Sequence, residues 1–179
     1  MLHSGRFIID ANVIVLNSLA SLITSREDGR GVLAIDMQSE PDLTIVLNGG
    51  SAYPIRAEDF DGADFKIHME GGETFKRAVI EFSNSIDRVL EKANKKLSDV
   101  NFFVPHQANL RIIQAVAKRI GLPIEKVSVT LNKFGNSSST SIGLALTDAL
   151  DNNKIKKGDL VLFTAFGGGF TWGSTLMIW

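Results

Sequence analysis

The chain of 179 residues contains no cysteine. It therefore has no disulfide, no thiolate metal ligand and no cysteine nucleophile of its own. It also lacks an excess of charge of either sign, because 19 lysines and arginines nearly balance 20 aspartates and glutamates. We expect no global attraction to nucleic acid or to an acidic membrane surface, so a polyanionic partner would need a local basic patch.

Long uninterrupted apolar runs are missing as well. The longest apolar stretch, residues 7–23, contains Asp10, Asn12 and Asn17. These polar residues make a membrane-spanning helix costly and favour a buried segment of a globular domain. Residues 1–6 are too short and too weakly basic for the start of a secretory signal. We expect no membrane partner and a cytoplasmic location, with which the absence of cysteine is compatible.

The residues that are present, 44% hydrophobic and 22% charged, are typical of a globular protein. Residues 7–23 and 31–36 are rich in Val, Ile and Leu, which predicts two strands around a polar turn. Residues 38–64 carry prolines and glycines among acidic residues, which predicts an irregular surface connection. We assign residues 1–60 to these strands and this connection, and residues 61–179 to the main domain.

The second part of the chain alternates between helical and extended patterns. Apolar residues at three- and four-residue steps predict a helix over residues 73–96, and a second helical pattern stops at Gly121 and Pro123. A third helix is expected over residues 139–150. The expected strands are residues 101–104, 127–131, 160–166 and 170–179, with a loop over 132–138. This alternation indicates a layered α/β fold.

Two loops that follow expected strands carry candidate catalytic side chains. His106 lies in the first loop, and open α/β sheets commonly place their chemistry beyond the carboxyl ends of strands. Asn136 follows Gly135 in the second loop. Taken alone, each has a structural reading as a histidine satisfied by backbone groups or as an ordinary Gly-Asn turn. His3 and His68 have no partner at metal-ligand spacing, so no metal is expected.

Three motifs that follow one another along the chain favour the catalytic reading over the structural one. They are VPHQANLRII at residues 104–113, GNSSSTS at 135–141 and AFGGGFTWGS at 165–174. Over roughly residues 67–179, the chain resembles the second half of the β-ketoacyl-acyl-carrier-protein synthase III family. Residues 61–179 would then be the C-terminal domain of that family, and residues 1–60 match the end of its first half only weakly. These condensing enzymes have the thiolase fold. The resemblance implies a thiolase-like layered fold, with one βαβαββ-type half and additional N-terminal strands. It also implies initiation of fatty-acid synthesis by decarboxylative condensation of acyl-CoA with malonyl-acyl-carrier protein.

The resemblance also implies the roles of individual residues. His106 and Asn136 would donate hydrogen bonds to the thioester carbonyl oxygen of a malonyl group while carbon dioxide leaves, which stabilises the enolate. Phe166 would form an apolar wall of the substrate pocket, and it could equally be a core residue. Three glycines would permit a tight backbone beside that pocket. They are Gly167, Gly168 and Gly169.

The partner implied by the resemblance is the acidic acyl carrier protein, with CoA thioesters as substrates and no cofactor. Arg111, Lys118 and Arg119 on one helix could form the local basic patch that such a partner needs, although a solvated helix face is an equal reading. The stretch expected to meet the carrier protein is Gln107, Ala108, Asn109, Leu110 and Arg111.

The chain departs from the family pattern in size and in its nucleophile. Whole members are roughly twice the size of a single domain like this one and carry a catalytic cysteine in their first half. The resemblance therefore implies a C-terminal half that needs a Cys-bearing synthase half or a homologous subunit, and hence an oligomer. The alternative is a catalytically inactive module that binds acyl carrier protein or a synthase subunit. A third reading is an unrelated α/β domain with chance motifs.

Overall fold

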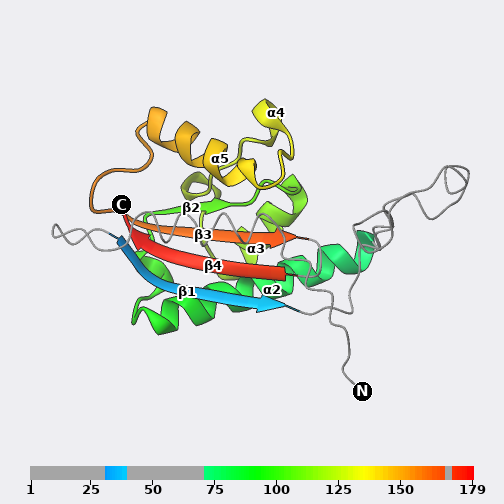
Figure 1. Ribbon diagram of the computed structural model, residues 1–179, viewed down its shortest axis with the longest axis horizontal. Helices are drawn as coiled ribbons and strands as arrows, with labels where there is room; N and C mark the ends of the chain where they lie inside the picture. Colours follow the sequence, from blue (N-terminus) through cyan, green and yellow to red (C-terminus); the bar gives the residue numbers. More distant parts are fainter. Residues whose placement is uncertain (1–30, 40–70, 168–170) are drawn as a thin grey trace, which may run out of the picture.

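The computed structural model describes residues 31–39, 71–167 and 171–179. In this part of the chain, helices cover both faces of a four-stranded mixed sheet (Figure 1). The sheet order is β1-β4-β3-β2; the β1–β4 and β4–β3 pairs are antiparallel, and the β3–β2 pair is parallel. The strands are β1 (Gly31–Ser39), β2 (Phe102–Pro105), β3 (Leu160–Gly167) and β4 (Thr171–Ile178).

The helices form two layers. On one face of the sheet lie α2 (Gly71–Lys92) and α3 (Leu110–Ile120), which contact each other. On the other face lies α5 (Thr140–Asp151), with the short α4 (Leu131–Phe134) beside it. Two 3-10 turns, η3 (Leu97–Asp99) and η4 (Ile124–Lys126), complete the described elements. The layered α/β architecture expected from the sequence is confirmed.

Strand β3 is apolar on both faces because it contributes to two cores. Leu162 and Phe166 pack with the buried residues of α2 and α3. Val161 and Phe163 pack with the buried residues of α5. Alternate side chains of a strand point to opposite faces, so a strand covered on both sides becomes a nearly continuous apolar run. In β3 this run is interrupted by Thr164, whose buried hydroxyl pairs with that of Ser174.

Helix α2 ends four residues earlier than its apolar pattern predicts. Asn94 adopts a left-handed backbone conformation with φ of 50°. The backbone N–H of Lys95 then donates to the carbonyl of Leu90, as is common where a helix closes on a left-handed residue. Helix α3 ends as predicted, because Gly121 adopts φ of 76° just after Ile120.

The strand predicted over residues 127–131 is wrong. Val127 forms an isolated parallel bridge with Phe103, and the N–H of Ser128 donates to the Phe103 carbonyl. The next bond of a parallel ladder would need an N–H at Pro105, which proline lacks. The pairing therefore stops, and the chain enters α4 within the stretch expected to be a loop.

Strand β1 is joined to α2 by a buried carboxylate. Asp36 is fully buried, and its carboxylate accepts hydrogen bonds of 2.9 Å from each of Ser85, Arg88 and Lys92. Burial alone would raise the pKa of Asp36. The hydrogen bonds, from Lys92 first, outweigh burial and hold the pKa of that carboxyl below its ordinary value.

The strand expected over residues 31–36 is confirmed and continues to Ser39. The predicted strand over residues 7–23 and the connection over 38–64 lie outside the described residues, apart from the end of β1. The proposed boundary at residue 60 lies outside them too. Within the described ranges, no helix combines the length and apolar character needed to span a membrane.

Candidate active site

His106 lies directly after β2 and is held by elements on two sides. Its backbone N–H donates to the carbonyl of Thr164 on β3 over 2.8 Å, which extends the parallel pairing of β2 and β3 by one bond. The side chain is only 4% exposed. Its Nδ1 lies 2.5 Å from the hydroxyl oxygen of Ser141 in the first turn of α5. The position of the imidazole is therefore fixed by both the sheet and α5.

Gln107 lies in the interior and fastens the loop after β2 to the segment before α4. Its Nε2 donates to the carbonyls of Pro105 and Ser128, over 2.9 and 3.1 Å. Its Oε1 accepts the N–H of Thr130 over 2.8 Å. The side chain thus satisfies the Ser128 carbonyl that Pro105 cannot bond. Because Gln107 is fully buried, it is removed from the surface expected to meet a carrier protein.

Asn136 lies in the loop between α4 and α5 and is exposed. Its Oδ1 accepts the backbone N–H of Ser138 over 3.0 Å, and its Nδ2 donates to the carbonyl of Ala108 over 3.5 Å. The preceding Gly135 has φ of 62° and ψ of −160°, a conformation essentially restricted to glycine. The loop of Asn136 therefore meets the loop of His106, and the two predicted donors are brought to the same end of the sheet.

Phe166 lies near the carboxyl end of β3 and is 8% exposed. Its ring makes an edge-to-face contact with Phe82 of α2, with ring centroids 5.7 Å apart. The structure therefore places Phe166 within the core of α2 and α3. Gly167 ends β3 opposite Thr171. Gly168 and Gly169 lie outside the described residues.

Of the five residues expected to meet a carrier protein, the exposed ones lie at the start of α3. Asn109 caps this helix by accepting the N–H of Arg111 over 2.8 Å. Asn109, Leu110 and Arg111 are exposed, whereas Ala108 is half-buried. Lys118 and Arg119 are also exposed, and the sequence of α3 contains no acidic residue. The start of α3 is therefore accessible close to His106 in the chain, whereas Lys118 and Arg119 lie in the last turn of the helix.

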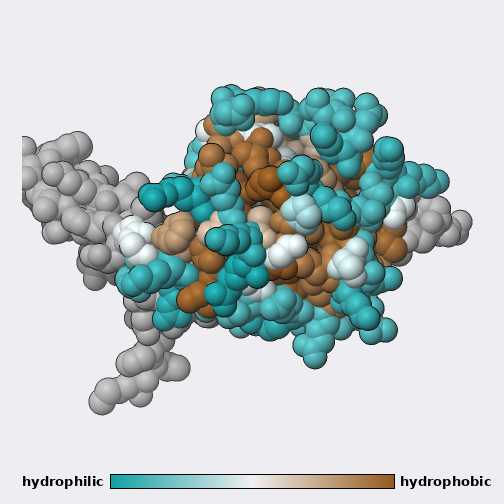
Figure 2. All heavy atoms as spheres, turned by 180° about the vertical axis from the view of Figure 1, so that it is seen from behind, coloured by the Kyte–Doolittle hydropathy of each residue, from teal (hydrophilic) through white to brown (hydrophobic). Residues whose placement is uncertain are grey.

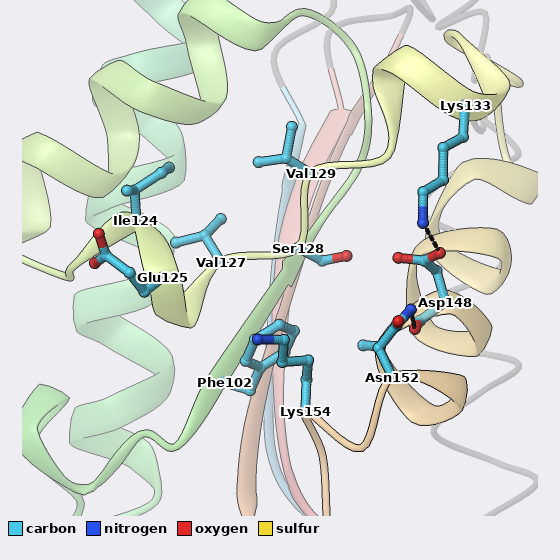
Figure 3. A pocket seen from close by; sticks show the side chains of 11 residues that line it. Phe102, Ile124, Glu125, Val127, Ser128, Val129, Lys133, Asp148, Asn152 and Lys154 are labelled. Atoms are coloured by element: carbon cyan, nitrogen blue, oxygen red, sulfur yellow. Dashed lines mark hydrogen bonds and ion pairs between the residues drawn. The ribbon is translucent and has the colours of Figure 1, made fainter.

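A groove of about 410 Å³ lies away from these residues, between the segment 127–129 and the second half of α5 (Figure 3). Lys133 and Asp148 form an ion pair at one end of it, and Ser128 donates from its floor to the carbonyl of Ala145. None of the predicted site residues lines this groove. In the described part of the chain, no cluster of three His, Asp or Glu side chains could hold a metal ion.

Sequence reasoning missed the contact between Ser141 and His106. The available signal was a polar residue at the start of a helix whose other inward positions, such as Ile142 and Ala145, are apolar. Ser141 is also the last residue of the GNSSSTS motif. Neither feature indicates which side chain the hydroxyl meets, because His106 is 35 residues earlier.

Comparison with known proteins supports the resemblance seen in the motifs. The family described as "3-Oxoacyl-[acyl-carrier-protein (ACP)] synthase III C terminal" matches residues 90–179. The Beta-ketoacyl-[acyl-carrier-protein] synthase III of Fusobacterium nucleatum is 39% identical over 163 residues, which are 89% of this chain and 50% of that protein. That of Campylobacter curvus is 45% identical over 139 residues, which are 78% of this chain and 42% of that protein.

A solved structure shows the same likeness in three dimensions. The crystal structure of 3-oxoacyl-[acyl-carrier-protein] synthase III from Aquifex aeolicus matches with a TM-score of 0.74 and 40% identity, over 87% of this chain and 47% of that one. The chain thus spans about half the length of the curated relatives it matches. With these matches the thiolase-like layered α/β fold is confirmed, and the chain belongs to the 3-oxoacyl-[acyl-carrier-protein] synthase III C-terminal family.

Proposed function

We propose that this chain supplies the C-terminal half of the active site of a 3-oxoacyl-[acyl-carrier-protein] synthase III, which initiates fatty-acid synthesis in the cytoplasm. The observation that carries the proposal is the meeting of two loops at one end of the sheet. The amide of Asn136 reaches the carbonyl of Ala108, two residues after His106. In the proposal, two neutral hydrogen-bond donors from separate motifs act together where these loops meet.

The proposed reaction needs such donors at the first step. When a malonyl thioester loses carbon dioxide, the electrons of the broken carbon–carbon bond form an enolate, and negative charge develops on the thioester oxygen. N–H groups of His106 and Asn136 that are already directed at this oxygen stabilise the charge as it develops. One such donor typically contributes about 3–4 kcal/mol to the transition state. The enolate carbon then attacks an acyl thioester, from which a cysteine thiolate leaves.

The acylated cysteine is supplied from outside these 179 residues, on a Cys-bearing synthase half or a homologous subunit. Exposed apolar side chains support an assembly of this kind, because such surface is common at protein interfaces. Ile124 and Phe134 are 42% and 45% exposed. Apolar side chains also gather in the middle of the face opposite that of Figure 1, with hydrophilic ones around them (Figure 2).

The proposed substrates are CoA thioesters and malonyl-acyl-carrier protein, without a separate cofactor. Acyl carrier protein would approach the start of α3, where Arg111 is exposed. The basic residues of α3 complement an acidic partner, and this complementarity mainly affects association rate and specificity. In the proposal, the phosphopantetheine-bound malonyl group enters beside His106.

The first experiment is to purify the chain under gentle conditions and measure its intact mass together with the mass of any chain that copurifies. We expect a stoichiometric partner with a reactive cysteine. Carbon dioxide release from malonyl-acyl-carrier protein by this pair is then compared between the wild-type chain and His106→Ala. The variant should lose nearly all decarboxylation, and unchanged release would remove the role assigned to His106.

The same material distinguishes the catalytic proposal from an inactive binding module. A module would bind acyl carrier protein or a synthase subunit without turnover, and His106→Ala would leave that binding unchanged. Carrier-protein binding without decarboxylation by the purified pair would therefore replace the catalytic proposal with the module.

A further inference from the structure

Ser141 is buried between two groups of the His106 loop. Its side chain is 1% exposed, so bulk water does not reach the hydroxyl. The hydroxyl oxygen accepts the backbone N–H of Gln107 over 3.2 Å. The same oxygen lies 2.5 Å from Nδ1 of His106. The hydroxyl therefore connects the first turn of α5 to both the ring and the backbone of this loop.

The two contacts determine which atom carries the shared proton. An amide N–H is always a donor, so the Ser141 oxygen must act as acceptor toward Gln107. A hydroxyl also has one hydrogen to donate, and leaving a buried donor unused costs free energy. Among the described residues, Nδ1 of His106 is the acceptor that the structure gives to this hydrogen. Nδ1 is therefore the unprotonated nitrogen of the neutral ring.

We propose that Ser141 is a positioning residue that holds neutral His106 in the tautomer with its proton on Nε2. This inference rests on the proposed function, because that function requires the ring to present an N–H to the enolate oxygen. The opposite tautomer would present a lone pair at Nε2 and repel the developing charge. Ser141 thus acts on catalysis through His106, in the way that hydrogen bonds to one imidazole nitrogen commonly set the role of the other.

The tautomer of His106 can be determined directly by NMR spectroscopy of the full chain labelled with ¹⁵N-histidine. Two-bond ¹H–¹⁵N correlation spectra are recorded at about pH 8.5, where an ordinary histidine is neutral. The His106→Gln variant identifies the His106 signals among the three histidines. We expect a protonated Nε2 and an unprotonated Nδ1 whose resonance is displaced by an accepted hydrogen bond. A protonated Nδ1 in the wild-type chain would overturn the proposal.

Variants distinguish the loss of the Ser141 hydroxyl from the general effect of substituting a buried residue. Ser141→Ala should move the Nδ1 resonance, and an unchanged resonance would refute the role of Ser141. Ser141→Thr, which keeps the hydroxyl, should retain the wild-type pattern. Ser83→Ala is the matched control, because the hydroxyl of Ser83 is also buried but donates to the Val79 carbonyl within α2. It should leave the His106 spectrum unchanged.

The spectra need no turnover, so they remain decisive even where the proposed function fails. With a reconstituted Cys-bearing pair, Ser141→Ala should lower the decarboxylation rate about 10- to 100-fold, the usual range for a group that orients a catalytic side chain. Substrate KM should change little, because Ser141 is buried behind the ring. A loss confined to KM would argue against the positioning role.

Discussion

The side-chain amide of Asn136 donates to the backbone carbonyl of Ala108 and so joins the loop before α5 to the loop after β2. Its carbonyl oxygen is occupied by the N–H of Ser138, which fixes the direction of the amide group. Within the described part of the chain, the second N–H of the amide has no partner, and it is the one that we propose meets a substrate oxygen. Asn136 therefore has a structural contact and a proposed catalytic one at the same nitrogen.

Asn136→Ala should reduce decarboxylation by a reconstituted pair about 10²- to 10³-fold, the usual cost of losing one oxyanion donor. The melting temperature should change little, because Asn136 is exposed. Asn152→Ala is the control, since the side chain of this exposed asparagine donates to the backbone carbonyl of Asp148 at the end of α5, away from the candidate site. Equal activities of the two variants would exclude Asn136 from the reaction.

Gln107→Leu should lower the free energy of unfolding by about 3 kcal/mol or more. The substitution leaves two buried carbonyls and one buried N–H without their partners, and each such group costs about 1–3 kcal/mol. Chemical denaturation measures the loss. Gln114→Leu changes the same residue type at an exposed position of α3 and should stay within about 0.5 kcal/mol of wild type. Similar stability of both variants would contradict the bridging role of Gln107.

Gly135→Ala should lower the free energy of unfolding by about 1–3 kcal/mol, because a residue with a side chain is strained at the backbone angles of Gly135. Among the described residues other than its chain neighbours, none has an atom within 4 Å of the added carbon, so the cost comes from the backbone. The neighbouring Asn136 should be misdirected, and activity should fall with stability. Gly143→Ala, inside α5 with equally open space, should instead stabilise the chain by about 0.5–1 kcal/mol. A neutral Gly135→Ala variant would show that the loop tolerates another conformation.

Asp36→Asn should destabilise the chain by about 1–3 kcal/mol near pH 7, because Arg88 and Lys92 lose their buried counter-charge. The pKa of Asp36 is lower in the folded chain than in the unfolded chain. Its contribution is therefore complete above the unfolded pKa, near 4, and is lost as pH falls through the folded value. Unfolding measured between about pH 2 and 7 should show a smaller pH dependence for the variant. Parallel curves would contradict this linkage.

Arg111→Glu should weaken binding of acyl carrier protein about fivefold, which corresponds to roughly 1 kcal/mol at an exposed site. The difference should shrink at high salt, since exposed charges are screened. Lys157→Glu makes the same charge change at an exposed residue of the loop before β3. If both variants bind alike, the interaction depends on net charge and the start of α3 has no special role.

The local sequence pattern predicted most of the fold, because the apolar residues of most helices and strands recur with the period of that element. The stripe of Phe82, Ile86 and Val89 is buried as expected, and Gly121 ends α3 as expected. The prediction of a strand over residues 127–131 failed for a reason that lies elsewhere in the sequence. Alternating apolar residues favour a strand there, but the missing N–H of Pro105 prevents the ladder from continuing.

The candidate site was predictable in part. The motifs identified His106 and Asn136, and the structure brings their loops together. The internal role of Gln107 could not be predicted, because a glutamine in a loop is ordinarily exposed and two of its three contacts, to Ser128 and Thr130, come from another segment. The role of Ser141 likewise depends on a partner distant in the sequence. Motifs indicate which side chains are candidates for a catalytic role, whereas the contacts that orient them depend on the packed fold.

Strand β4 places Trp172 opposite Phe166, and both side chains are buried. The chain has two tryptophans, and the other one, Trp179, is its last residue. With Trp179 replaced by phenylalanine, the indole of Trp172 becomes the single tryptophan emitter. The protein therefore has a built-in fluorophore across from Phe166 in the core of α2 and α3, so that the packing of this core can be followed optically without a label.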